Sequence, residues 1–303
     1  MGTLIALRYS TKLFANLADH TYVTCGTGRK AWGCWGGKTG GTVLRQGTGS
    51  TARANAIAGA DEKANIRCYL INGVCHQAAN RILFPAGITV AGARGYGVSE
   101  SLFGPYGRPS GPFGTCASPF NQYPTVAGDI PDCAGPAVAG KVLRTAKAQM
   151  SSQERLREKK YLGRVLASYG KAGRMFTAKH KHIGPEAEGF HVEIFLLKAE
   201  YNLGRLDRAL TAKLTDIRRS AERSRMQIEH WYSNNEMRLA EFAKAFDRET
   251  VVFQDTMAGA LKADQYKALF GLQRGETITL ANPAIVKAMS RGAAPRRRGK
   301  MKR

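Results

Sequence analysis

The sequence predicts an α+β protein, with a mixed α/β region first and a mainly helical, basic region after it. Three observations support this class. The first hundred residues contain short apolar and β-branched runs bounded by Gly, which is typical of strands. A stretch rich in Gly and Pro then interrupts regular structure over residues 104–140. Beyond residue 141, apolar residues recur every three or four positions, as in amphipathic helices.

The first domain, residues 1–103, is expected to begin with strands. Residues 4–9 form a short apolar run. Residues 20–25 form a β-branched and aromatic run that ends in Gly-Thr-Gly, and residues 31–35 follow it closely. The latter two runs predict a hairpin. Gly- and Thr-rich sequence fills residues 36–51.

Two helices are expected in the rest of this domain. Residues 52–70 are Ala-rich, with apolar residues at helical spacing. Gly73 breaks the pattern, and residues 75–83 resume it as a second helix. Pro85 and Gly87 mark the end of that helix, because neither residue continues one readily.

The second half of the chain divides into three parts. Residues 104–140 predict a Gly/Pro-rich linker or an irregular wrapping segment, and residues 141–282 predict a helical basic region. Residues 283–303 are expected to be a disordered basic tail, because they have little apolar surface to bury. The clearest helical signal is an apolar stripe formed by Leu203, Leu206, Leu210, Leu214 and Ile217. The arginines around this stripe predict a solvated basic face on a helical hairpin or bundle.

The charge balance indicates an anionic polymer as partner. The chain has 46 Lys and Arg against 23 Asp and Glu, a formal net charge of +23. Residues 136–303 hold 34 of these basic and 17 of these acidic residues, so most of the excess lies in the second half. Such a charge favours nucleic acid, anionic lipid or bacterial cell wall. The predicted polyanion-binding residues of the tail are Arg296, Arg297, Arg298, Lys300, Lys302 and Arg303.

The cysteines and the apolar runs indicate the cellular compartment in which the protein is made. Six cysteines occur without a CxxC pair, so we expect mostly reduced thiols, no metal site and no cofactor. The first residues lack a signal-peptide pattern, and no apolar stretch is long enough for a membrane span. The expected route is synthesis in the cytoplasm, with export by a dedicated injection system or carriage in a particle.

The segment that carries chemistry surrounds Cys75. This cysteine is expected at the first turn of a helix, directly after the break at Gly73. A helix N-terminus offers backbone N–H groups and a positive dipole end, which favour thiolate over thiol. The same N–H groups can hold the oxyanion that forms when a thiolate attacks a carbonyl. Cys75 is therefore the candidate nucleophile.

A thiolate enzyme also needs a base that later protonates the leaving group. His20 opens a strand that can lie beside the helix start, and it is the candidate base. His76 follows Cys75 directly, and adjacent side chains on a helix diverge by about 100°. We therefore expect His76 to point away from the thiol.

The order of these two residues resembles the circularly permuted papain-like proteins, which include the lecithin:retinol acyltransferase family and related bacterial wall peptidases. In that acyltransferase family a strand beginning with His comes first, and an Asn-Cys-Glu-His-Phe type motif opens a later helix. Residues 72–77, Asn-Gly-Val-Cys-His-Gln, are similar to that motif, and residues 20–23, His-Thr-Tyr-Val, to that strand. The resemblance covers about residues 15–90.

The resemblance implies a papain-like fold for residues 1–103 and a cysteine hydrolase or acyltransferase activity. The family usually has a third polar residue on the next strand, and that strand here offers none. A backbone carbonyl, Asp19 or Asp61 is left as the candidate that orients the imidazole. The aromatic residues that could line a substrate groove beside His20 are Trp32, Trp35 and Tyr22.

The expected substrate is the peptide of bacterial cell walls, because related proteins act there and a basic protein suits an anionic wall. The chain would then be a lysin or an injected antibacterial effector, with delivery machinery or an immunity protein as further partners. The alternative is a non-enzymatic, nucleic-acid-associated or structural protein of a phage-like particle. Two other sites are disfavoured: Gly36-Gly37-Lys38-Thr39 lacks the first Gly of a phosphate-binding loop, and the histidines at 180, 182 and 191 lack further ligands at metal spacing.

Overall fold

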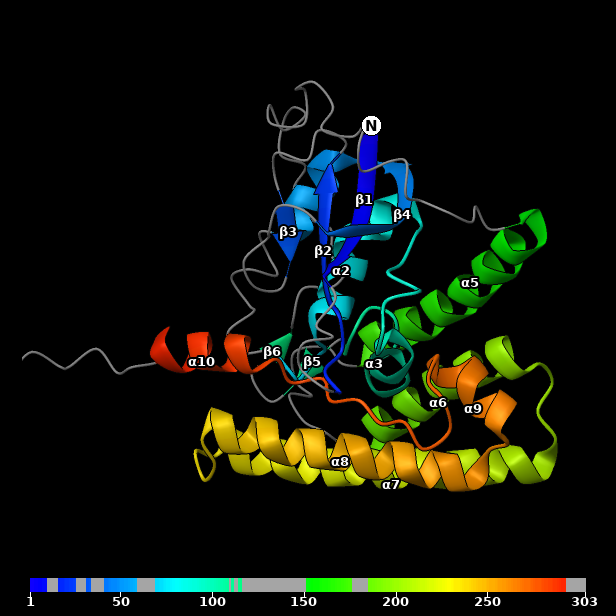
Figure 1. Cartoon of the computed structure of the whole chain (residues 1–303), viewed down its shortest axis with the longest axis vertical. Coiled ribbons are helices and arrows are strands. Elements are labelled where there is room, and N and C mark those ends of the chain that lie inside the picture. Colours follow the sequence, from blue (N-terminus) through cyan, green and yellow to red (C-terminus); the bar gives the residue numbers. More distant parts are fainter. Residues whose placement is uncertain are drawn as a thin grey trace, which may run out of the picture.

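The structure is a computed structural model of the whole chain. It describes residues 1–9, 16–25, 31–33, 41–58, 69–108, 110–111, 114–115, 151–175 and 185–292. Figure 1 shows a β-sheet at one end of the molecule and a long helical hairpin at the other, with short helices between them. The α+β class predicted from the sequence is confirmed.

The sheet of the described part of the chain is antiparallel, and its strands lie in the order β3 (Ala31–Gly33), β2 (His20–Cys25), β1 (Gly2–Tyr9) and β4 (Thr42–Gly49). The first strand and the hairpin were predicted, but the edge strand β4 was not. Its sequence, Thr-Val-Leu-Arg-Gln-Gly-Thr-Gly, looks too rich in Gly for a strand. A Cβ at Gly49 would lie 2.6 Å from the backbone of Pro85, so glycine is needed where the chain passes over β4.

The helix α2 (Cys75–Leu83) packs on this sheet and begins where the sequence predicts. A short 3-10 turn, η1 (Phe84–Ala86), ends it, and Gly87 follows in the left-handed region with φ of 65°. The preceding segment differs from the predicted helix over 52–70. Residues 51–58 are helical, but Leu70 has a φ of 65° and lies in a turn. The next helix, α3 (Tyr96–Phe103), packs against α2 and lies near the middle of the molecule (Figure 1).

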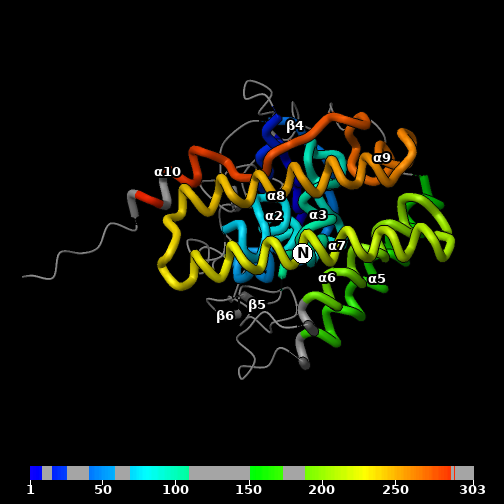
Figure 2. The backbone as a smooth tube through the Cα atoms, turned by 90° about the horizontal axis from the view of Figure 1, so that it is seen from below, coloured from blue at the N-terminus to red at the C-terminus, as the bar shows by residue number. Residues whose placement is uncertain are grey.

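The described part of the second half is mainly helical, as predicted. The helices α7 (Arg208–Ser233) and α8 (Leu239–Ala260) run side by side as an antiparallel hairpin, which Figure 2 shows from below. The carboxylate of Asp207 caps α7 by accepting the Leu210 backbone N–H at 2.7 Å. Further helices of this half are α5 (Ser152–Met175), α6 (Pro185–Leu203), α9 (Ala263–Phe270) and α10 (Pro283–Gly292). Residues 110–111 and 114–115 pair as the short strands β5 (Ser110–Gly111) and β6 (Gly114–Thr115).

The largest hydrophobic core joins the two halves of the chain. It contains Cys75 and Phe103 from the first half, and Phe195, Phe246 and Phe270 from the helices. The rings of Phe103 and Phe246 stack with centroids 5.6 Å apart. Residues 1–103 and the helical region therefore share a core, which sequence alone did not indicate.

Three expectations about the chain need correction. Residues 283–292 form α10 rather than part of a disordered tail, because Ile285 and Val286 are buried in the core. The rest of that tail lies outside the described residues. Residues 105–108 are buried and ordered rather than part of a linker. Cys25 is disulfide-bonded, so the expectation of reduced thiols does not hold for it, whereas Cys75 is a thiol. Within the described ranges, no helix is both long enough and apolar enough to cross a bilayer.

Candidate active site

The turn before α2 fixes the position of Cys75. Gly73 has a φ of 154°, and a Cβ there would lie 2.5 Å from the Cβ of Gln77. The side-chain carbonyl of Gln77 reaches back and accepts the Val74 backbone N–H at 3.1 Å. Cys75 is thus the first residue of a capped helix, next to backbone N–H groups that no helical carbonyl satisfies.

The polar side chains of α2 hold the helix in place, although all nine of its residues are buried. Asn80 donates to the carbonyl oxygen of Pro105 at 2.7 Å and accepts the Val90 backbone N–H at 2.8 Å. Arg81 donates to the carbonyl oxygen of Tyr106 at 2.9 Å. Buried polar groups need such partners, so the segment after α3 is required to complete the helix that carries Cys75.

The thiol and the following histidine contact the same atom. Cys75 Sγ lies 3.6 Å from the carbonyl oxygen of Asp19, and His76 Nε2 lies 3.0 Å from that oxygen. A carbonyl only accepts, so Nε2 carries the hydrogen, and Nδ1 faces Ser99 Oγ at 2.8 Å. The expectation that His76 points away from the thiol is therefore wrong: both side chains converge on the residue before His20.

His20 is close in the chain to that contact, but its side chain does not bond to the thiol. Both of its ring nitrogens are buried and lack a hydrogen-bond partner among the described residues. Val23 belongs to the core cluster that includes α2, whereas Tyr22 packs with Leu7 on the opposite face of the sheet. Side chains alternate along a strand, so His20 shares the face of Tyr22 and not that of α2.

Among the described residues, the structure does not bring the other predicted site residues together around His20. The buried carboxylate of Asp19 accepts from Arg8 Nη1 at 2.8 Å and from the Arg94 backbone N–H at 3.0 Å, so it does not orient His20. Asp61 and Trp35 lie outside the described residues. Trp32 lies in β3, where only the backbone is described. Tyr22 is fully buried and packs within the protein rather than lining an open groove.

A cluster of buried charged side chains joins Arg108 to α6 and α7, and the sequence did not lead us to expect it. Arg108 donates to His191 Nε2 at 3.0 Å and to Glu229 at 2.5 Å, and contacts Glu222 at 3.3 Å. Arg225 donates to Glu222 at 2.5 Å. The predicted basic face of α7 is therefore wrong in part, because its members Arg218 and Arg225 are buried.

The sequence contained a signal for this cluster. The buried residues of α7 continue the spacing of the apolar stripe beyond Ile217, but with charged side chains. Oppositely charged residues at that spacing meet on one face of a helix. The buried stripe therefore continues along α7, but its side chains change from apolar to charged. The charged members are Arg218, Glu222, Arg225 and Glu229.

Burial sets the protonation of this cluster. It lowers the pKa of His191 well below its usual value, and nearby Arg108 and Arg225 lower it further. Burial alone would raise the pKa of Glu222, but the positive charges of Arg225, Arg218 and Arg108 hold it well below its usual range. His191 is thus neutral and Glu222 ionised near neutral pH.

The two disfavoured sites gain no support from the described parts of the chain. No group of three or more His, Cys, Asp or Glu there is arranged to hold a metal ion, and His191 belongs to the ion cluster. The loop at 36–39 and the histidines at 180 and 182 lie outside those parts. Comparison of the chain with protein-family models, with curated proteins and with solved structures found no match.

Proposed function

We propose that this protein is a cysteine hydrolase, with Cys75 as the nucleophile and His20 as the base. The observation that carries the proposal is the place of the Cys75 thiol at the start of the buried helix α2, against the carbonyl group of the residue before His20. A helix laid on an antiparallel sheet with a cysteine at its start also suits the permuted papain-like fold that the sequence resembles.

The reaction would begin with transfer of the Cys75 thiol proton to the His20 imidazole, and the resulting thiolate would attack an amide carbonyl carbon. The C–S bond forms as the carbonyl π pair moves to oxygen, and the N–H groups of the first turn of α2 stabilise that oxyanion. The imidazolium then gives its proton to the leaving amine, and the C–N bond breaks to leave an acyl-enzyme. Water hydrolyses the thioester, with the imidazole as base.

The role of His20 requires its ring to turn from the Tyr22 face toward α2. No hydrogen bond among the described residues holds the ring where it lies, since both its nitrogens are unpartnered. His76 is bonded through both nitrogens and wholly buried. We therefore assign His76 to positioning: it donates to the Asp19 carbonyl and fixes the segment from which β2 starts.

The proposed substrate is the peptide of bacterial cell walls. The support is the net charge of +23, which suits an anionic wall. In this proposal the protein is a lysin or an injected effector. The alternative, a nucleic-acid-associated particle protein, is less well supported because Arg218 and Arg225 are buried and do not face a nucleic acid.

The test compares three variants in a wall-digest assay that measures released amines. Cys75→Ser and His20→Gln should each abolish release without changing the denaturation midpoint, because the serine hydroxyl is a poor nucleophile and glutamine takes no proton. His76→Gln should lower stability as well as activity, since its ring bonds two buried groups.

Two results would reject parts of this proposal. Full release by Cys75→Ser would end the thiol mechanism. Full release by His20→Gln, with an altered pH–rate profile in His76→Gln, would move the role of the base to His76. Circular dichroism of each variant separates loss of chemistry from loss of folding.

A further inference from the structure

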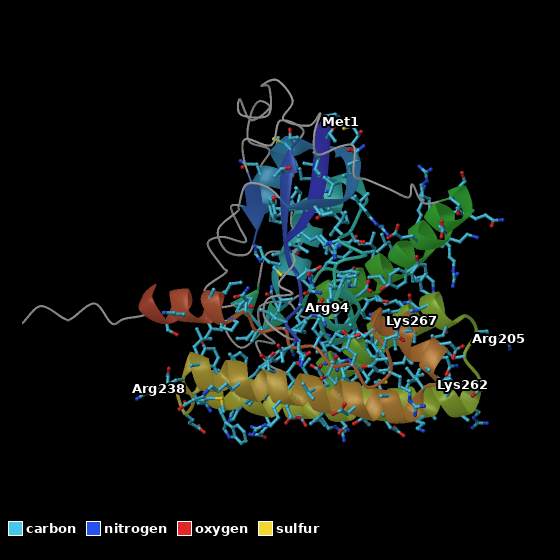
Figure 3. The ribbon with its side chains drawn as sticks, viewed as in Figure 1. Met1, Arg94, Arg205, Arg238, Lys262 and Lys267 are labelled. Carbon is cyan, nitrogen blue, oxygen red and sulfur yellow. The ribbon has the colours of Figure 1, made fainter. Side chains whose placement is uncertain are left out.

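A pocket of about 540 Å³ lies where the sheet region meets the helices, apart from the residues discussed above as catalytic. That volume lies in the range of small-molecule sites, about 300–1,000 Å³. Its lining comes from both halves of the chain and includes four cations and three carboxylates. They are Arg8, Arg45, Arg94, Lys198, Glu100, Glu158 and Glu276. Figure 3 shows one of them, Arg94, between the sheet and the helical hairpin.

The floor of the pocket is a satisfied polar cluster. Glu100 Oε1 accepts from Tyr96 Oη at 2.9 Å and from Tyr161 Oη at 3.1 Å. The buried ammonium of Lys198 lies 3.5 Å from Glu100 Oε2 and donates to Ser101 Oγ at 2.8 Å. These groups bond mainly to one another, so the floor is fixed before any ligand enters.

The arginines on the walls keep unused donors. Arg8 bonds only to Asp19 and Arg45 only to Glu158, each through one Nη1, among the described residues. Arg94 bonds to the Leu17 carbonyl and to Glu276. A guanidinium has more N–H donors than these bonds use, and all three side chains are partly exposed.

We propose that this pocket binds a short peptide through its free carboxylate and free ammonium. Arg45 and Arg94 donate to the carboxylate, since arginine matches carboxylate geometry. Glu158 and Glu276 stand beside these arginines and accept from the ammonium. A doubly charged phosphate fits less well, because three carboxylates share the lining with the four cations.

An ion pair between Arg8 and Asp19 connects the pocket to the candidate active site. Arg8 lines the pocket and bonds to the Asp19 carboxylate, while the carbonyl of Asp19 contacts Cys75 Sγ. A peptide held here therefore lies next to the segment that positions the thiol. The binding itself does not depend on thiol chemistry.

The experiment measures binding by calorimetry with the full chain carrying Cys75→Ser, so that no turnover occurs. The probes are alanyl-alanine, its C-terminal amide, its N-acetyl form and inorganic phosphate. Alanyl-alanine should bind, and each blocked form should bind about tenfold more weakly, since each loses a charge-assisted hydrogen bond. Phosphate should not displace the dipeptide.

Two variants locate the site. Arg45→Gln and Arg94→Gln should each weaken alanyl-alanine binding about tenfold. The matched control is Arg164→Gln, which breaks an exposed pair with Glu200 away from the pocket and should leave binding unchanged. The proposal would be overturned if alanyl-alanine did not bind, if its amide bound equally well, or if phosphate bound more tightly. It would also be overturned if Arg45→Gln and Arg164→Gln had equal effects on dipeptide binding. Wall-digest activity of the wild type tests the hydrolase proposal, whereas calorimetry tests the pocket. Either proposal can therefore fail without the other.

Discussion

Arg108 donates its backbone N–H to the carbonyl oxygen of Asn72 at 2.8 Å, while its guanidinium bonds to Glu229 of α7. One residue thus ties the turn before Cys75 to the helical hairpin. The turn that presents the candidate nucleophile is supported by a buried ion cluster more than a hundred residues further along the chain.

Replacing Arg108 by leucine should destabilise the protein strongly. The change removes a positive charge that pairs with the buried carboxylates of Glu222 and Glu229. Breaking a buried ion pair in this way costs about 3–5 kcal/mol of folding free energy. The matched control is Arg223→Leu, which removes an exposed partner of Glu188 and should change little. Urea denaturation measures both, and equal effects would show that the buried cluster contributes no more than a surface pair.

The stability of the protein should fall as the pH drops below about 6.5. The pKa of buried His191 is lowered in the folded state, so the unfolded chain binds a proton first and folding weakens in acid. Glu222, whose pKa is also lowered, adds a further loss only below about 4.5. The groups facing His191 are Arg108, Arg218, Arg225 and Glu222.

The variant His191→Gln separates these two contributions. It should flatten the dependence of unfolding free energy on pH between 7 and 5, since glutamine does not titrate. The exposed His230 supplies the control, and His230→Gln should leave the slope as it is. Denaturant titrations at four pH values provide the measurement, and an unchanged slope in His191→Gln would contradict the assignment.

Gly107 should not tolerate alanine. Its φ is 85°, and a Cβ would lie 2.1 Å from the carbonyl oxygen of Asn72. Positive φ alone costs about 1–3 kcal/mol, and the clash adds to it. By contrast, Gly163 lies in α5 with open space around its Cβ position, so Gly163→Ala should stabilise by about 0.5–1 kcal/mol. Thermal melts of the two variants should shift in opposite directions.

Two truncations should differ at the C-terminus. Deleting residues 293–303 removes six basic residues and no acid, so it should weaken polyanion binding and reduce its salt dependence. Deletion from Pro283 also removes α10, and with it the buried Ile285 and Val286. Only the longer deletion should lower the melting temperature. Heparin affinity at two salt concentrations and calorimetry check both expectations.

The local features of the fold were predictable from the sequence. The helix that starts at Cys75 follows from Gly73 and the apolar spacing, and the hairpin of β2 and β3 follows from β-branched runs. The edge strand β4 was not predictable, because its Gly49 is required by the passing backbone of Pro85, which comes later in the chain.

Side-chain placement at the site was predictable only in part. The position of Cys75 at a helix start depends on neighbouring residues, so its sequence carries that information. The face on which His20 lies depends on strand register and on which side α2 packs, and neither is visible in the order of residues. The burial of Arg218 likewise depends on the carbonyl oxygens of Ser101 and Leu102, which belong to a segment more than a hundred residues away in the chain.

The pairing of Leu17 with Thr279 has a consequence for biosynthesis. The Ala18 backbone N–H donates to the Thr279 carbonyl at 3.0 Å, and the Thr279 N–H donates to the Asn16 carbonyl at 2.6 Å. The segment that leads into Asp19 and His20 therefore acquires its neighbour only after more than 250 further residues have been synthesised. A nascent chain that stops before Thr279 lacks this support, so the candidate site cannot be completed until that residue has been added.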